Sequence, residues 1–205
     1  DSGDVKMFGM DFYQHEKECK QQIGVVFGGV DFYPLKKLSS ITAVTRRFYS
    51  AWDQEKYEHY LKLFDLDDEK KFKELSNGMK VKYLLSLALS HHAKLLILDE
   101  PTSGLDPVVR EEVLDILKEF VMDESHSVLI SSHIISDIEK TADYAAFIHQ
   151  GRLMLCEEKD RLLDEYRILK GSRSDIMKME EDGGVRVAGM RENSFGAEAL
   201  VKTNS

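Results

Sequence analysis

Cysteines and long apolar segments are both scarce in this sequence. Only two cysteines occur in 205 residues, Cys19 and Cys156, and neither has the spacing of a metal site, so we expect free, reduced cytosolic thiols. No apolar run approaches the roughly 20 residues needed to span a bilayer. The opening residues, DSGDVKMFGM, lack the charged-then-apolar order of a signal peptide. We therefore expect a cytoplasmic protein without direct membrane insertion, which reaches a membrane only through a partner.

Basic character is also missing. The formal net charge is −9, whereas a protein that binds a nucleic-acid backbone needs a basic surface, so nucleic acid is not expected as the main ligand. Hydrophobic residues make up 42% and charged residues 32% of the chain, as in an ordinary soluble globular protein. No internal repeat interrupts the sequence, and its length suits one large domain or one domain with a small appendage.

Apolar periodicity predicts alternating strands and helices. We predict strands at 22–27, 95–98, 127–131, 144–148 and 152–155, and helices at about 106–120, 134–140 and 159–166. The run Leu95–Leu98 is typical of a strand covered on both faces. This alternation indicates βαβ units and therefore an α/β fold with a mostly parallel sheet.

The stretch 34–90 has a helical pattern. One stripe of a helix is formed by Tyr57, Tyr60, Leu61 and Phe64, and Asp53 is placed to cap that helix. The leucine-rich stretch 84–89 predicts a second, more buried helix.

The segment from Leu95 to Asp106, LLILDEPTSGLD, carries the strongest chemical signal. A strand of a parallel sheet delivers the residues that follow it to the edge where ligands bind in open α/β sheets. Asp99 lies at that edge and offers the oxygen ligand that Mg²⁺ prefers. Glu100, the next residue, is placed to polarise an attacking water as a general base. An acidic turn after DE is common, but DEP followed by TSGLD is far more specific.

Two further motifs flank this segment. In LSNGMK, residues 75–80, Ser76 is a good N-cap for the next helix, and Gly78 lets the backbone approach an anion at the helix N-terminus. His133 ends the sequence SSH after the next predicted strand, so its imidazole is expected on the same edge as Glu100, where it could meet a terminal phosphate. Taken singly, these would be an ordinary helix start and a structural histidine; their order along the chain favours function.

These motifs resemble those of the ABC ATPase family. LSNGMK is similar to the family's signature motif, LLILDEP to its Walker B strand, Ser103–Asp106 to its D-loop, and His133 to its switch histidine. The resemblance covers about residues 1–165 and is specific because the motifs occur in the family's order and spacing. The LSNGM signature most resembles bacterial exporter ATPases that pair with ABC-2-type membrane subunits.

The resemblance implies a P-loop NTPase-like fold, with a helical subdomain inserted at about 34–90. It implies an ATP-hydrolysing subunit that powers transport by an ABC transporter membrane subunit. It also implies a second ATPase subunit, with ATP and Mg²⁺ buried between the two, and a location in the cytoplasm at the membrane periphery.

The resemblance also implies a role for each motif residue near the nucleotide. Asp99 would bind Mg²⁺, Glu100 would activate water, and His133 would sense the γ-phosphate. The ATP of the opposite subunit would be contacted by Ser76, Asn77 and Gly78. The interface between the two subunits would include Ser103 and Asp106. The side chains of Phe32, Tyr33 and Leu35 are candidates either for contact with the membrane subunit or for the core of the helical subdomain.

The chain departs from the family in several respects. It contains no G-x-x-x-x-G-K-[S/T] phosphate loop, because two glycine pairs at the right separation lack the following lysine and hydroxyl. The opening Ser2–Val5 resembles the strand after the phosphate-loop helix, so we expect that the N-terminal phosphate-loop portion is absent and that this chain by itself is a poor or inactive ATPase. Gly28 stands where the Q-loop glutamine is expected, and Met79 takes the signature glutamine position.

Residues 1–165 are therefore predicted to form a partial ABC ATPase domain, with 166–205 as an extension of unassigned role. In that extension, Gly183-Gly184 before Val185–Val187 suggests a hairpin. One alternative is a degenerate nucleotide-binding or regulatory subunit that pairs with an active ABC ATPase, which Gly28 and the missing loop favour. A second is an ABC ATPase of the DNA-repair or translation type, which would carry coiled-coil arms or tandem halves that this chain lacks.

Overall fold

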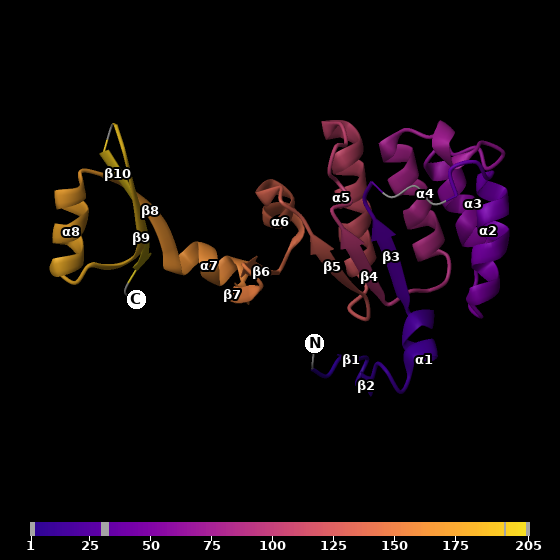
Figure 1. Ribbon diagram of the computed structural model, residues 1–205, viewed down its shortest axis with the longest axis horizontal. Helices are drawn as coiled ribbons and strands as arrows, with labels where there is room; N and C mark the ends of the chain where they lie inside the picture. Colours follow the sequence, from indigo (N-terminus) through magenta and orange to yellow (C-terminus); the bar gives the residue numbers. More distant parts are fainter. Residues whose placement is uncertain (1–2, 30–32, 195, 204–205) are drawn as a thin grey trace. The chain divides into compact units, whose positions relative to one another are not determined.

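The computed structural model describes residues 3–29, 33–194 and 196–203 (Figure 1). The chain separates into two compact units, Asp1–Asp137 and Ile138–Ser205, and each is considered by itself. This division differs from the predicted ATPase domain over 1–165 and extension over 166–205. The predicted division concerns the extent of a family domain rather than compactness, and it stays a prediction.

A three-stranded parallel sheet forms the centre of the first unit. Its strands are β3 (Ile23–Phe27), β4 (Leu95–Asp99) and β5 (Ser127–Ser131), in the order β3-β4-β5. The helices α4 (Asn77–Leu89) and α5 (Pro107–Val121) pack on one face. On that face Val26, Leu96 and Leu98 are buried. The predicted parallel arrangement of these strands is confirmed.

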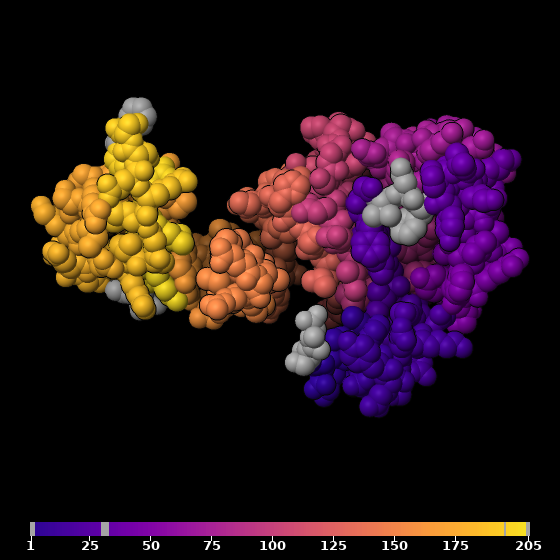
Figure 2. Space-filling model, in the orientation of Figure 1, coloured from indigo at the N-terminus to yellow at the C-terminus, as the bar shows by residue number. Residues whose placement is uncertain are grey.

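The other face of this sheet is open in the described part of the chain. Val25, Ile97 and Leu129 are register neighbours across the three strands. Val25 is 42% exposed and Leu129 is 60% exposed, and Figure 2 shows the indigo atoms of β3 at the surface of the first unit. Two covered faces were predicted for Leu95–Leu98, but among the described residues only the face of Leu96 and Leu98 is fully covered, because α4 and α5 lie on the same side; Leu95 and Ile97 on the other face are half-buried.

Helices fill the stretch between β3 and β4, as predicted. They are α2 (Leu38–Thr45), the 3₁₀ turn η1 (Arg46–Phe48), α3 (Gln54–Leu63), the 3₁₀ turn η2 (Phe72–Glu74) and α4. Asp53 caps α3, because its Oδ1 accepts a 2.9 Å hydrogen bond from the backbone N–H of Lys56. No helix within the described ranges has both the length and the apolar character needed to cross a bilayer.

One threonine hydroxyl joins the three long helices of this stretch. Thr42 Oγ1 of α2 lies 2.8 Å from the hydroxyl of Tyr57 on α3 and 2.9 Å from that of Tyr83 on α4. The Tyr83 hydroxyl also donates to the backbone oxygen of Leu38 at 3.1 Å. All three side chains are buried, and burial raises the pKa of Tyr57 to about 12. The network therefore satisfies polar groups that would otherwise be costly to bury.

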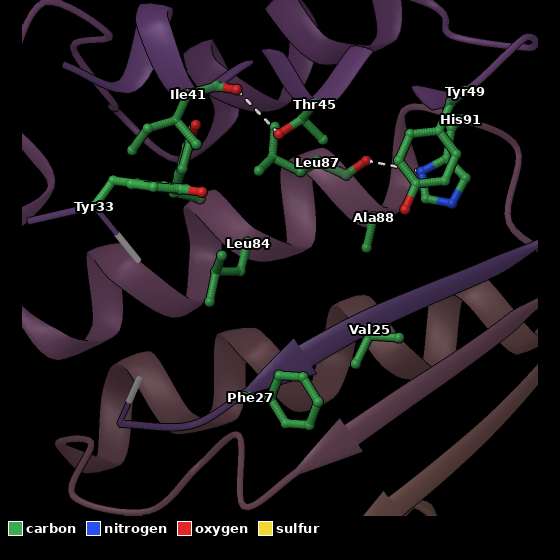
Figure 3. Close-up of a pocket in the computed structure, with 11 residues that line it drawn as sticks. Val25, Phe27, Tyr33, Ile41, Thr45, Tyr49, Leu84, Leu87, Ala88 and His91 are labelled. Atoms are coloured by element: carbon green, nitrogen blue, oxygen red, sulfur yellow. Dashed lines mark hydrogen bonds between the residues drawn. The ribbon is translucent and has the colours of Figure 1, made fainter. Parts of the chain in front are cut away.

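A mostly apolar pocket of about 220 Å³ lies between β3 and the helices (Figure 3). At one end of it, His91 stacks on Tyr49 with ring centroids 3.7 Å apart. The two ring nitrogens of His91 each lie 3.1 Å from a backbone oxygen, of Leu87 and of Ile23. Burial lowers the pKa of His91, and this effect outweighs the opposing influence of the two backbone oxygens.

Short elements precede the sheet. A two-stranded hairpin of β1 (Lys6–Met7) and β2 (Met10–Asp11) leads into α1 (Glu16–Gln21). Of the strand predicted at Ser2–Val5, Ser2 lies outside the described residues, and the first strand begins at Lys6.

The second unit is built from antiparallel strands. β6 (Tyr144–His149) pairs with β7 (Arg152–Glu158), and the helix α7 (Lys159–Glu165) follows them. The next three strands are β8 (Tyr166–Gly171), β9 (Val185–Asn193) and β10 (Gly196–Thr203), and they form a sheet in the order β8-β10-β9. α8 (Arg173–Glu181) packs on this sheet through Ile176. A hairpin was predicted near Gly183–Val187; the hairpin joins β9 to β10 instead, and Gly183 lies in the turn that ends α8.

Replacing Thr42 with valine should lower the free energy of unfolding by about 1–3 kcal/mol, because the Tyr57 hydroxyl loses its buried partner. Urea unfolding of the full chain measures this change. Thr45→Val is the matched control, since the Thr45 hydroxyl donates to the backbone oxygen of Ile41 in its own helix. Equal losses in the two variants would contradict the role given to the shared hydroxyl.

The lowered pKa of His91 predicts a pH-dependent stability. Below the ordinary histidine pKa of 6.5 the unfolded chain takes up a proton that the folded chain resists. The free energy of unfolding should therefore fall as the pH falls from about 7.5 to about 5. His91→Gln should reduce this fall, whereas His59→Gln, at an exposed position of α3, should leave it unchanged. The measurement is denaturant unfolding at several pH values, and an unaltered slope in His91→Gln would refute the assignment.

Candidate functional site

The register of the parallel sheet brings three chain segments to one edge. Phe27, Asp99 and Ser131 are direct neighbours across β3, β4 and β5, and each is the last residue of its strand. The residues that follow the three strands must therefore meet at the carboxyl edge, where ligands bind in open α/β sheets. Asp99, Glu100 and His133 were predicted at this edge, and the structure brings them together there.

Ser131 joins the two acidic residues. Its hydroxyl donates to Asp99 Oδ1 at 2.5 Å and accepts from the backbone N–H of Glu100 at 3.1 Å. The same N–H also lies 3.1 Å from the backbone oxygen of Ser131. Sequence reasoning quoted Ser131 as part of SSH without giving it a role. The available signal was its place at the end of a predicted strand next to that of Asp99.

Glu100 and His133 form a direct pair. Nδ1 of His133 donates to Glu100 Oε2 at 2.7 Å, and the two side chains are 67% and 35% exposed, respectively. The backbone φ of Glu100 is +49°, a left-handed conformation that residues other than glycine adopt at a cost. The pair is thus a solvent-accessible carboxylate held by an imidazole on a strained turn, a geometry suited to orienting a water molecule.

Gly28 lies directly against this turn. Its backbone N–H donates to the backbone oxygen of Asp99 at 2.8 Å. A Cβ added at Gly28 would overlap the backbone oxygen of Glu100. The glycine found in place of the expected Q-loop glutamine is therefore required by close packing on the acidic turn, and a glutamine would fit there only if the backbone moved.

The residues present fit a magnesium ion that is shared with a phosphate ligand. Asp99 supplies a carboxylate, and the Ser131 hydroxyl lies beside it; Mg²⁺ prefers such oxygen ligands and often takes only one or two carboxylates, completed by water and phosphate. Within the described ranges, no group of three or more His, Cys, Asp and Glu side chains could hold a metal by itself. A protein-only metal site is thus not formed by these residues.

Ser76, Asn77 and Gly78 lie on a different element, at the beginning of α4. Ser76 is its N-cap, since the side chain accepts from the backbone N–H of Met79 at 3.2 Å. A Cβ at Gly78 would come within 2.6 Å of the Val109 side chain on α5. The sequence interpretation of Gly78 considered only an approaching anion, but the packing of α4 on α5 also requires glycine here.

Ser103 and Asp106 follow the acidic turn. The backbone N–H of Ser103 donates to the oxygen of Glu100 at 3.2 Å, and its side chain is exposed. Asp106 is the N-cap of α5, because its Oδ1 accepts from the backbone N–H groups of Val108 and Val109 at 3.1 Å each. Their predicted interface role stays a prediction.

The candidates for contact with a membrane subunit lie before α2. Tyr33 is 68% exposed and Leu35 is 66% exposed, which argues against a place in the core of the helical stretch. Phe32, the third candidate, lies outside the described residues.

Comparisons with known proteins show the family of this chain. A family model described as ABC transporter matches residues 1–103. The ABC transporter ATP-binding protein YtrB of Bacillus subtilis (strain 168) is 31% identical over 166 residues, which are 81% of this chain and 56% of YtrB. The bacitracin transport ATP-binding protein BcrA of Bacillus licheniformis is 31% identical over 155 residues, 75% of this chain and 51% of BcrA. The chain thus spans about half the length of these curated relatives.

Two solved structures show the fold. One, an ATP-binding subunit of an ABC transporter, has a TM-score of 0.66 at 23% identity and covers 87% of this chain and 76% of that chain. The other, a dimeric post-hydrolysis state of the ATP-binding cassette MJ0796 bound to ADP and Pi, has a TM-score of 0.64 at 22% identity and covers 77% and 73%. The predicted P-loop NTPase-like fold class is confirmed.

Replacing Gly28 with alanine should destabilise the first unit by about 1–3 kcal/mol, because the new methyl group overlaps the backbone of Glu100. Urea unfolding of the full chain measures the loss. Gly189→Ala is the control, since a Cβ at Gly189 meets nothing within 4 Å. A Gly28→Ala variant as stable as this control would show that the close approach is not needed.

Proposed function

The chain belongs to the ABC transporter family, and from this premise we propose that it is part of an ATP-hydrolysing subunit that powers transport by partner membrane subunits. The observation that carries the proposal is the convergence of Asp99, Glu100 and His133 at one edge of the parallel sheet. The 2.7 Å pair of Glu100 and His133 beside the Asp99–Ser131 hydrogen bond supplies a general base for water, an imidazole and a carboxylate suited to Mg²⁺, which are among the groups used in phosphoryl transfer to water.

Each of these residues has a distinct part in the proposed reaction. Glu100 orients the attacking water and accepts its proton. His133 holds the Glu100 carboxylate through Nδ1, and its Nε2 is free to contact the γ-phosphate. Asp99 and Ser131 would hold Mg²⁺, which when bound neutralises charge on the phosphates. Phosphoryl transfer depends mainly on such positioning and charge stabilisation rather than on covalent chemistry.

We propose further that two ATPase subunits complete the site. Ser76, Asn77 and Gly78 lie at the beginning of α4, a 13-residue helix whose N-terminus favours an anion. The resemblance of these residues to the family's signature motif supports a contact with the ATP of an opposite subunit, so that each ATP would be held from both sides. MJ0796, a structural neighbour, is dimeric with ADP and Pi bound. Ser103 and Asp106 would lie along the shared interface.

Such a subunit would work in the cytoplasm and reach the membrane through its partners. The exposed Tyr33 and Leu35 are proposed to contact the membrane subunit, since large exposed apolar side chains favour a partner surface. The substrate contacts would lie on the membrane subunits, so the transported compound is not assigned.

A degenerate subunit that binds nucleotide without turnover is the second candidate. The observations that favour it are Gly28, which places no side chain near the acidic turn, and the lack of a phosphate-loop lysine in the 205 residues. The retained Glu100–His133 pair favours hydrolysis instead.

The Glu100→Gln substitution tests the proposed function. In the protein produced from its complete reading frame, ATP hydrolysis should fall roughly 100-fold or more, because the amide cannot accept the proton of water. ATP binding, measured by calorimetry, should persist. Glu58→Gln, at an exposed position of α3, is the matched control and should hydrolyse ATP at the wild-type rate.

Two other outcomes would count against this proposed function. An undiminished rate in Glu100→Gln would remove Glu100 from its proposed part. Wild-type protein that binds ATP without hydrolysing it would favour the degenerate subunit.

A further inference from the structure

A carboxylate buried behind the candidate site has no part in the proposed reaction. The Asp137 side chain, on α6 (Ile135–Thr141), is fully buried. Its Oδ2 accepts from the Thr102 hydroxyl at 2.6 Å, and its Oδ1 accepts from Nε of Arg110 at 2.6 Å. Arg110 also donates from Nη2 to Ser136 Oγ at 2.7 Å. A buried carboxylate is costly unless it is paired and hydrogen-bonded, and these partners meet that requirement.

The buried cluster joins the two chain segments that carry the catalytic pair. Thr102, which is 1% exposed, follows Glu100 after a single proline. Asp137 lies in the first turn of α6, the helix that follows His133. The Glu100–His133 bond and the Thr102–Asp137 bond therefore link the same two segments, one at the surface and one in the interior.

We propose that Asp137 is a positioning residue that sets the separation of Glu100 and His133 by holding Thr102 and Arg110. This inference depends on the proposed function, because the separation matters only if the pair acts on water. It adds a role for a side chain that sequence reasoning did not single out.

The exposed pair needs this support. His133 is 67% exposed and Glu100 is 35% exposed, so water and salt compete with their single hydrogen bond. Glu100 also holds a strained positive φ, which persists only where the surroundings enforce it. Asp137 and Thr102 are shielded from solvent, where charge-assisted hydrogen bonds are stronger. Their hydrogen bond thus fixes the segments more firmly than the surface pair does.

The test replaces Thr102 with valine, which keeps the shape of the side chain and removes its hydrogen bond. In the protein from its complete reading frame, kcat for ATP hydrolysis should fall roughly 10-fold to 100-fold, as expected for a small misplacement of reacting groups. KM for ATP should stay within about two-fold, because the phosphate contacts are untouched. Thr102→Ser keeps the hydroxyl and should restore most of the rate.

A background without the general base shows whether Thr102 acts through the pair. In Glu100→Gln protein, Thr102→Val should cause no further loss of kcat, since residues that act as a unit are non-additive. Thr42→Val is the matched control: it is the same substitution at a buried threonine of the same unit, and it should leave kcat within about two-fold of wild type.

Amide hydrogen exchange gives a readout that does not require turnover. Thr102→Val should speed amide exchange roughly 10-fold in both 100–105 and 132–138, because these segments would open locally more often without the Thr102–Asp137 hydrogen bond. Thr42→Val should not change exchange in these segments. The inference is overturned if Thr102→Val keeps the wild-type kcat, if it loses the same factor in the Glu100→Gln background, or if exchange changes in neither segment. An inactive wild type, or a Glu100→Gln variant as active as wild type, would instead contradict the proposed function, and the exchange data would still decide whether Asp137 holds the two segments.

Discussion

The common register of β3, β4 and β5 is the constraint on which the site depends. All three strands end at the same level, at Phe27, Asp99 and Ser131. A slip of one residue would turn every side chain to the opposite face of the sheet and separate Asp99 from its serine. Burial of Val26 and Leu96 under the helices opposes such a slip. Apolar packing in the core therefore keeps the polar residues at the carboxyl edge in their places.

Much of the first unit could be predicted because its signals are local. The run before Asp99 gives a strand, Asp53 gives a helix start, and the order of the motifs places Glu100 and His133 on one edge. The hydrogen bond of Ser131 with Asp99 was not predicted, although both residues end predicted strands. The role of Asp137 could not be predicted, since it lies within a helix and only the tertiary contacts show that it meets Thr102. The open face of the sheet was missed for the same reason: an apolar run does not show what covers it.

Gly28 shows how a departure from a family pattern can change meaning once the fold is known. In the sequence it stands where the Q-loop glutamine is expected, and so indicates the loss of a functional side chain. In the structure the missing side chain is what allows the chain to lie against the backbone of Glu100. The strained φ of Glu100 is found at the same point. Function and packing are therefore not separable at this turn, and a glutamine could not be restored without altering the neighbouring backbone.

The hydroxyl shared by Thr42, Tyr57 and Tyr83 has a mechanical consequence. Helices that meet at one buried polar point cannot slide past each other without breaking hydrogen bonds inside a dry core. We therefore expect α2, α3 and α4 to move together as one rigid group rather than to slide past one another. A displacement of α2 should therefore be accompanied by a displacement of α4, whose first turn carries Ser76–Gly78.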